Sequence, residues 1–115
     1  MKKFIILIPL YNDWQSASKL LDEIDFQVNN WEAEVSVIIV NDASTELKTG
    51  LDKSFKKIKT LKILNMKENK VHQRCIAAGL KYIVRNEDFD RVIIMDADGE
   101  DRPAELHNFY KKAQE

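Results

Sequence analysis

The chain has 115 residues, of which 44% are hydrophobic and 32% are charged, and it contains three glycines and two prolines. This length fits a single domain spanning residues 1–115, and the composition excludes a disordered or fibrous chain. Eighteen basic and nineteen acidic residues give a net charge of -1, which leaves no broad cationic surface for nucleic acid or anionic lipid. No run approaches the roughly 20 apolar residues that span a bilayer, so we expect a cytoplasmic domain.

Two kinds of segment alternate along the sequence. Short runs rich in Ile and Val predict strands, and their nearly continuous hydrophobicity is typical of strands that are covered on both faces of a parallel sheet. The segments that follow them carry apolar residues at helical spacing. In chain order, we predict a strand at 4–9, a helix at 14–28, a strand at 35–40, a helix at 44–58, a strand at 61–64, a helix at 71–84, a strand at 92–95 and a helix at 104–113.

This βαβαβαβα order predicts an α/β fold, in which an open, mostly parallel sheet carries helices on both faces. Ligands on such sheets bind beyond the carboxyl ends of the strands. A dinucleotide-binding domain or a nucleotidyltransferase would carry a glycine-rich loop after the first strand, and this chain has none there. The residues that follow each strand are therefore the candidate site residues.

Two carboxylates, Asp96 and Asp98, follow the last predicted strand with one small residue between them. Such a pair suits a hard cation, because Mg²⁺ and Mn²⁺ take oxygen ligands and are often held by one or two carboxylates together with substrate phosphates. Taken alone, a polar turn that closes a strand is the commoner explanation of this pattern. The other strand exits have to decide between the two.

The first two strand exits are also polar. Asn41 and Asp42 end the second strand, where an amide and a carboxylate could read the donor edge of a base, and the hydroxyls that follow could cap a helix. After the first strand, Pro9 and Tyr11 stand where a base or ribose could stack. Asp13 could serve the same ligand or cap the next helix.

Four segments in order, 8–13, 37–45, Asn69 with 77–80, and 93–103, resemble the motif series of the family 2 glycosyltransferases. The resemblance covers the chain from residue 4 to about residue 110 and is especially close to the polyprenyl-phosphate sugar transferases. It implies a GT-A fold and inverting transfer from a UDP- or GDP-sugar, with Mg²⁺ or Mn²⁺, to an acceptor sugar or polyprenyl phosphate.

The resemblance also assigns roles to individual residues. It implies that Asp42 hydrogen-bonds the base, that Asp98 is the direct metal ligand, and that Asp96 lies nearer the ribose while contributing to the metal site. The remaining residues expected to bind the nucleotide are Pro9, Tyr11, Asp13 and Asn69. One departure from the family motif is Ala43, which stands where a glycine is common and for which we expect no positive φ.

Members of the family continue into a second half that carries the acceptor site and a carboxylate general base. We therefore expect that base beyond Glu115, a domain that is incomplete for catalysis by itself, and a longer protein that could be peripheral to a membrane. A half-domain would expose apolar surface, which predicts self-association into a homo-oligomer. The alternative is a non-catalytic nucleotide-binding or assembly module. The single cysteine, Cys75, is expected to be a small buried thiol in a helix.

Overall fold

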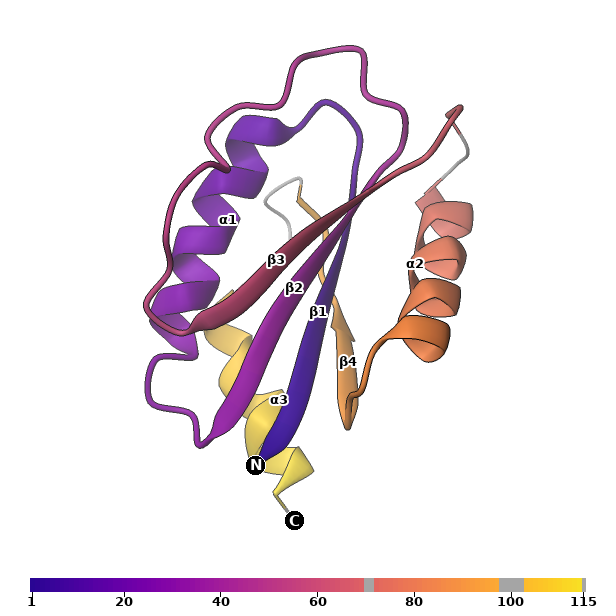
Figure 1. The fold of residues 1–115 in the computed structure, drawn as a ribbon. Helices are drawn as coiled ribbons and strands as arrows, with labels where there is room; N and C mark the ends of the chain where they lie inside the picture. The colour runs from indigo at the N-terminus through magenta and orange to yellow at the C-terminus, as the bar shows by residue number, and fades with distance from the viewer. Residues whose placement is uncertain (70–71, 98–102, 115) are drawn as a thin grey trace.

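The computed structural model describes residues 1–69, 72–97 and 103–114. Its four strands form one all-parallel sheet in the order β3-β2-β1-β4 (Figure 1). The predicted α/β class, a parallel sheet between helices, is therefore confirmed. In chain order the elements are β1 (Lys2–Leu10), α1 (Trp14–Gln27), β2 (Ala33–Asn41), β3 (Ile58–Asn65), α2 (His72–Asn86), β4 (Arg91–Ile94), a short 3-10 helix η1 (Pro103–Glu105) and α3 (Leu106–Ala113).

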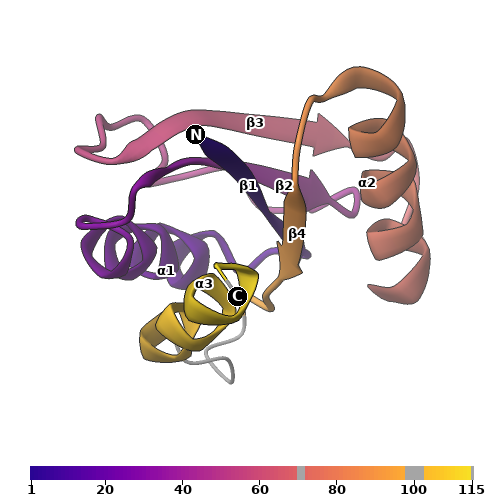
Figure 2. The same cartoon turned by 90° about the horizontal axis from the view of Figure 1, so that it is seen from below.

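The central strand β1 is buried on both of its faces. Phe4, Ile6 and Ile8 pack in one core with α1 and α3, whereas Ile5 and Leu7 pack in a second core with α2. Figure 2 shows the same division, with α1 and α3 on one side of the sheet and α2 on the other. Because successive side chains of a strand point to opposite faces, a strand with two covers must be apolar at every position. This accounts for the unbroken hydrophobic run of the sequence.

The predicted helix at 44–58 is wrong, and the observed order is βαββαβα. Residues 42–57, which we call the strap, instead run in irregular conformation alongside α1 (Figure 1). The apolar residues whose helical spacing predicted this helix do not share one buried face: Leu51 is buried and Ile58 opens β3, while Leu47 is 87% exposed.

Polar side chains of α1 explain why the strap is not helical. The Trp14 indole donates to the carbonyl of Glu46 (3.1 Å), and the Ser18 hydroxyl donates to the carbonyl of Gly50 (2.7 Å). At the far end, the Asp25 carboxylate accepts three consecutive main-chain N–H groups, those of residues 56, 57 and 58, at 2.8–2.9 Å. Main-chain groups that find partners on a neighbouring helix do not need a helix of their own.

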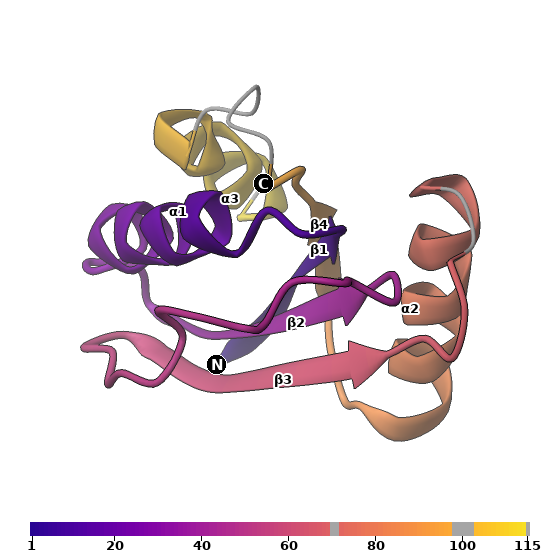
Figure 3. The same ribbon diagram turned by 90° about the horizontal axis from the view of Figure 1, so that it is seen from above.

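The direction of the chain across the sheet reverses next to β1. From β1 it passes to β2 and β3 on one side, and it then returns through α2 to β4 on the other side of β1. Figure 3, which views the carboxyl ends of the strands, shows α1 and α2 on opposite faces at this end. Open α/β sheets bind ligands at such a reversal, here between the ends of β1 and β4. None of the helices in the described ranges is long and apolar enough to cross a membrane.

Candidate functional site

Three adjacent strands bring the predicted site residues to one edge of the sheet. Tyr11 follows β1 and is 45% exposed, while Asp42 follows β2 and is only 6% exposed. Asp96 lies beyond β4 and is half-buried, and the register of β4 against β1, in which Ile94 pairs with Leu7, places it beside the end of β1. A flat, exposed phenol, a buried carboxylate and a half-buried carboxylate thus line the end of the sheet where ligands bind.

Asn12 joins the exits of β1 and β2. Its main-chain N–H donates to the Ser44 hydroxyl (2.9 Å), and its side-chain oxygen accepts the N–H groups of Thr45 and Glu46 at 2.8 and 2.9 Å. Its side-chain NH₂ donates to the Thr45 hydroxyl (3.0 Å). Asn12 has a φ of 62°, a left-handed conformation that asparagine tolerates better than most residues. The two hydroxyls expected to cap a helix therefore hold the two loops together instead.

Asn41 performs a similar function between β2 and β3. Its side-chain oxygen accepts the N–H of Ser44 (3.0 Å), and its NH₂ donates to the side-chain oxygen of Asn65 (3.0 Å). Both polar ends of this amide are thus engaged within the protein. The amide that could have read a base according to the sequence builds the turn after β2 instead.

Asp42 is fixed through its main chain. Its N–H donates to the carbonyl of Leu10 (2.8 Å), and its own carbonyl accepts from the side chain of Asn69 (3.2 Å). Burial, and then the Asp42 carboxylate, raise the pKa of the Cys75 thiol on α2 to about 12. The residue after Asp42, Ala43, has a φ of 56°, so the expectation that this position needs no positive φ is wrong. The sharp turn is set by the bonds of Asn41 and Asn12 to the residues that follow, and these bonds offset the strain of a left-handed alanine.

The structure gives Pro9 and Asp13 different positions. Pro9 is buried inside β1. The carbonyl of Leu7 accepts the N–H of Met95, so the main-chain groups of Leu7 point toward β4. Because these groups alternate in direction along a strand, the main chain of Pro9, two residues on, points toward β4 as well. A proline has no N–H, so it ends the ladder there and lets the chain after β4 turn away. Asp13 is exposed at the N-terminus of α1, and its side chain makes no capping hydrogen bond. The capping alternative for Asp13 is thus not observed.

A family model described as glycosyl transferase family 2 matches residues 5–115 of the chain, nearly its whole length. The chain belongs to glycosyltransferase family 2. Its four-stranded parallel sheet with helices on both faces agrees with the GT-A fold that this membership implies. A search of curated protein sequences finds no match to the chain.

The acidic motif of this family 2 domain comprises residues 96–98, of which the structure describes the first two. Asp96 stands between two buried residues, Met95 and Ala97, which anchor the turn after β4, whereas Asp98 lies outside the described residues. Within the described ranges, no three or more His, Cys, Asp or Glu side chains gather in a group that could hold a metal ion. The hard oxygen donors of the motif still fit Mg²⁺ or Mn²⁺, which complete their shells with water and substrate phosphates.

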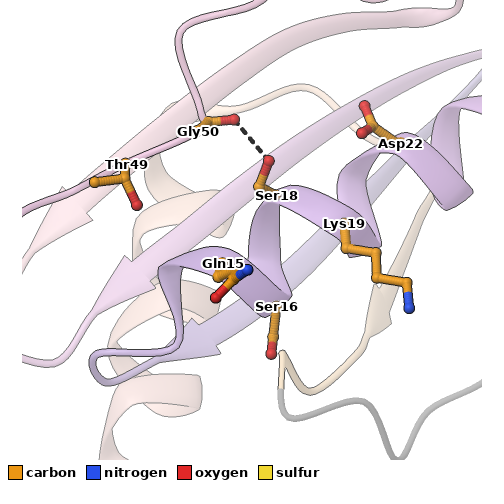
Figure 4. A pocket seen from close by; sticks show the side chains of 7 residues that line it. All are labelled: Gln15, Ser16, Ser18, Lys19, Asp22, Thr49 and Gly50. Atoms are coloured by element: carbon orange, nitrogen blue, oxygen red, sulfur yellow. Dashed lines mark hydrogen bonds between the residues drawn. The ribbon is translucent and has the colours of Figure 1, made fainter.

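A shallow polar hollow lies apart from these residues, on the solvent side of α1. Figure 4 shows it between α1 and the strap, with the Ser18–Gly50 hydrogen bond crossing its edge. Its lining residues are Gln15, Ser16, Ser18, Lys19, Asp22, Thr49 and Gly50. None of them is a predicted site residue of the glycosyltransferase. The hollow follows from the docking of the strap onto α1.

Sequence reasoning missed how Asn12 and Asn41 hold the loops of this glycosyltransferase site together. Both residues were recognisable as asparagines at the ends of strands, where this residue type favours turns and left-handed conformations. Cys75 was correctly predicted as a buried helical thiol.

Proposed function

We propose that this glycosyltransferase domain binds a nucleoside-diphosphate sugar at the carboxyl ends of β1, β2 and β4. The observation that carries the proposal is the convergence of Tyr11, Asp42 and Asp96 at this edge of the sheet, in a chain that belongs to family 2 from residue 5 to residue 115. Tyr11 offers an exposed ring on which a base or ribose can stack, and Asp42 offers a carboxylate that can accept a base N–H.

In this proposal, Asp96 and Asp98 hold Mg²⁺ or Mn²⁺ together with the diphosphate of the donor. The bound cation would supply electrostatic stabilisation of the negative charge that develops on the departing diphosphate. Asp13 at the start of α1 and Asn69 before α2 complete the group that faces the nucleotide, and Pro9 shapes the end of β1 from within. The domain would contribute this donor site to inverting transfer of the sugar, to an acceptor sugar or a polyprenyl phosphate. No described residue is assigned the role of the general base.

Calorimetric titration of UDP and of GDP, with and without Mn²⁺, tests this function. We expect binding of one of the two nucleotides that strengthens with metal and is weakened at least about tenfold by Asp98→Ala, the loss of about 1.4 kcal/mol. Asp88→Ala is the matched control, because this carboxylate is 86% exposed and pairs with Lys3 near the amino end of β1. Absence of binding by a folded sample would refute the proposal and favour the non-catalytic assembly module.

We also propose that two copies of the chain associate along β4. Among the described strands, β4 pairs only with β1, so its other edge carries main-chain groups that can accept a further strand. Ile94 on this strand is 44% exposed, and Phe109 on α3, beside β4, is 54% exposed. Apolar side chains at an unpaired strand edge favour association. A second copy of the chain is the proposed partner because it is always present in a sample of the protein.

A further inference from the structure

Asn65 is the last residue of β3, at the edge of the sheet where the nucleotide is proposed to bind. It pairs in register with Asn41, the residue before Asp42, and the ends of β2 and β3 lie side by side in Figure 3. The chain after Asn65 stays close to the turn after β2, because the N–H of Met66 donates to the carbonyl of Asn41 (2.9 Å). The side chain of Asn65 is exposed at this edge.

A chain of hydrogen bonds fixes which end of the Asn65 amide faces the protein. The main-chain N–H of Ser44 can only donate, and it donates to the side-chain oxygen of Asn41 (3.0 Å). The NH₂ of Asn41 is thereby directed at Asn65, whose side-chain oxygen accepts it (3.0 Å). The Asn65 NH₂ consequently points away from Asn41, and no described residue accepts a hydrogen bond from it.

The order of the strands indicates which part of a nucleotide can reach Asn65. The diphosphate and its metal are proposed at the end of β4, and the sheet order β3-β2-β1-β4 puts β3 three strand spacings, about 14 Å, from β4. A nucleoside diphosphate that lies across the strand ends from β4 therefore brings its far end, the base, toward β2 and β3.

We infer that Asn65 is a specificity-determining residue of the donor site, whose NH₂ donates to O4 of uracil or O6 of guanine. The inference rests on the proposed function. An NH₂ group can only donate, so it favours a base with a carbonyl oxygen at this position over cytosine or adenine, which carry an amino group there. Because the hydrogen bond from Asn41 orients the amide before the nucleotide arrives, the base meets a donor that is already in place.

Titrations with thio analogues test the inference, because each analogue changes one acceptor atom of the base. In 4-thio-UDP and 6-thio-GDP, a sulfur replaces O4 or O6 and is the weaker acceptor. With Mn²⁺ present, wild type should bind the oxygen form of its preferred nucleotide about threefold more tightly than the thio form, part of the value of one hydrogen bond. Asn65→Ala should bring this ratio close to one. Asn86→Ala, the control, removes an exposed asparagine at the end of α2 and should leave the ratio unchanged.

Asn41→Asp tests the chain of hydrogen bonds without altering Asn65. The introduced carboxylate still accepts the N–H of Ser44 but cannot donate, so Asn65 should turn its NH₂ inward and present its oxygen to the base. The ratio of oxygen form to thio form should again fall close to one. The added charge repels both forms of the nucleotide equally, and this effect cancels in the ratio.

The outcomes separate this inference from the proposed function. If wild type binds UDP or GDP but its ratio is close to one, or is unchanged in Asn65→Ala or in Asn41→Asp, the assignment of Asn65 is overturned and the proposed donor site stands. If a folded wild type binds neither nucleotide, the proposed function fails, and Asn65 has no base to select.

Discussion

Asp25 is the residue that fastens the end of the strap to α1, and its removal should cost more stability than the removal of any ordinary surface carboxylate. Its two oxygens accept the N–H groups of Lys56, Lys57 and Ile58 at 2.8–2.9 Å. Burial acts to raise the pKa of Asp25, but these three main-chain hydrogen bonds, led by that of Ile58, outweigh it and hold the pKa below its ordinary value. The carboxylate is therefore bound more favourably in the folded state than its acid form.

We expect Asp25→Ala to lower the free energy of unfolding by about 2–3 kcal/mol. A hydrogen bond to a charged group contributes about 1.5–3 kcal/mol, and three of them fall well short of additivity because Asp25 is only half-buried and water replaces part of the loss. For a chain of 115 residues, the unfolding entropy converts this loss into a decrease of about 10 °C in Tm. Urea denaturation and calorimetry would measure both quantities.

The pH dependence of this stability follows from the sign of the pKa shift. Because the folded-state pKa of Asp25 lies below the unfolded value of about 4, its contribution is fully present above pH 4 and is lost as the pH falls through the folded-state pKa. The difference in stability between wild type and Asp25→Ala should therefore shrink below about pH 4.

Asp22→Ala is the matched control for this prediction. Asp22 lies one turn earlier on α1 and pairs with Lys53 at 2.9 Å, but its side chain is 65% exposed, so its loss should cost less than about 0.5 kcal/mol. Equal losses of unfolding free energy in the two variants would refute the reasoning. A stability difference between wild type and Asp25→Ala that stays constant down to about pH 3 would refute it as well.

Two further predictions concern the turn after β2 and the edge of the sheet. Ala43→Gly should raise the free energy of unfolding by about 0.5–1 kcal/mol in urea denaturation, because glycine adopts the observed φ of 56° without strain; a loss of stability would show that the strain argument is wrong. In sedimentation equilibrium, wild type should gain apparent mass with concentration, and Ile94→Lys with Phe109→Glu should stay monomeric. Leu47→Lys, on the strap, is the exposed apolar control and should associate like wild type; a monomeric wild type would contradict the proposed association.

The sequence by itself determined the four strands and three of the predicted helices. Continuous apolar runs leave a buried parallel strand as the simple solution, and the amphipathic spacing of α1 and α2 is a local property that needs no partner to be read. The polar strand exits likewise predicted that Tyr11, Asp42 and Asp96 lie at one edge of the sheet, because parallel strands present their carboxyl ends at the same edge.

Only the tertiary structure decided the conformation of the strap and the fine construction of the site. The strap has helical spacing, yet Trp14, Ser18 and Asp25 of α1 bind its main chain and hold it in irregular conformation. Likewise, Ala43 takes a positive φ because distant partners fix the turn around it, and α2 packs close to Leu7 and Val40 of the sheet because Gly79 has no side chain. Periodicity reports which side chains prefer burial, whereas hydrogen bonds between segments far apart in the chain exist only once the fold has brought them together.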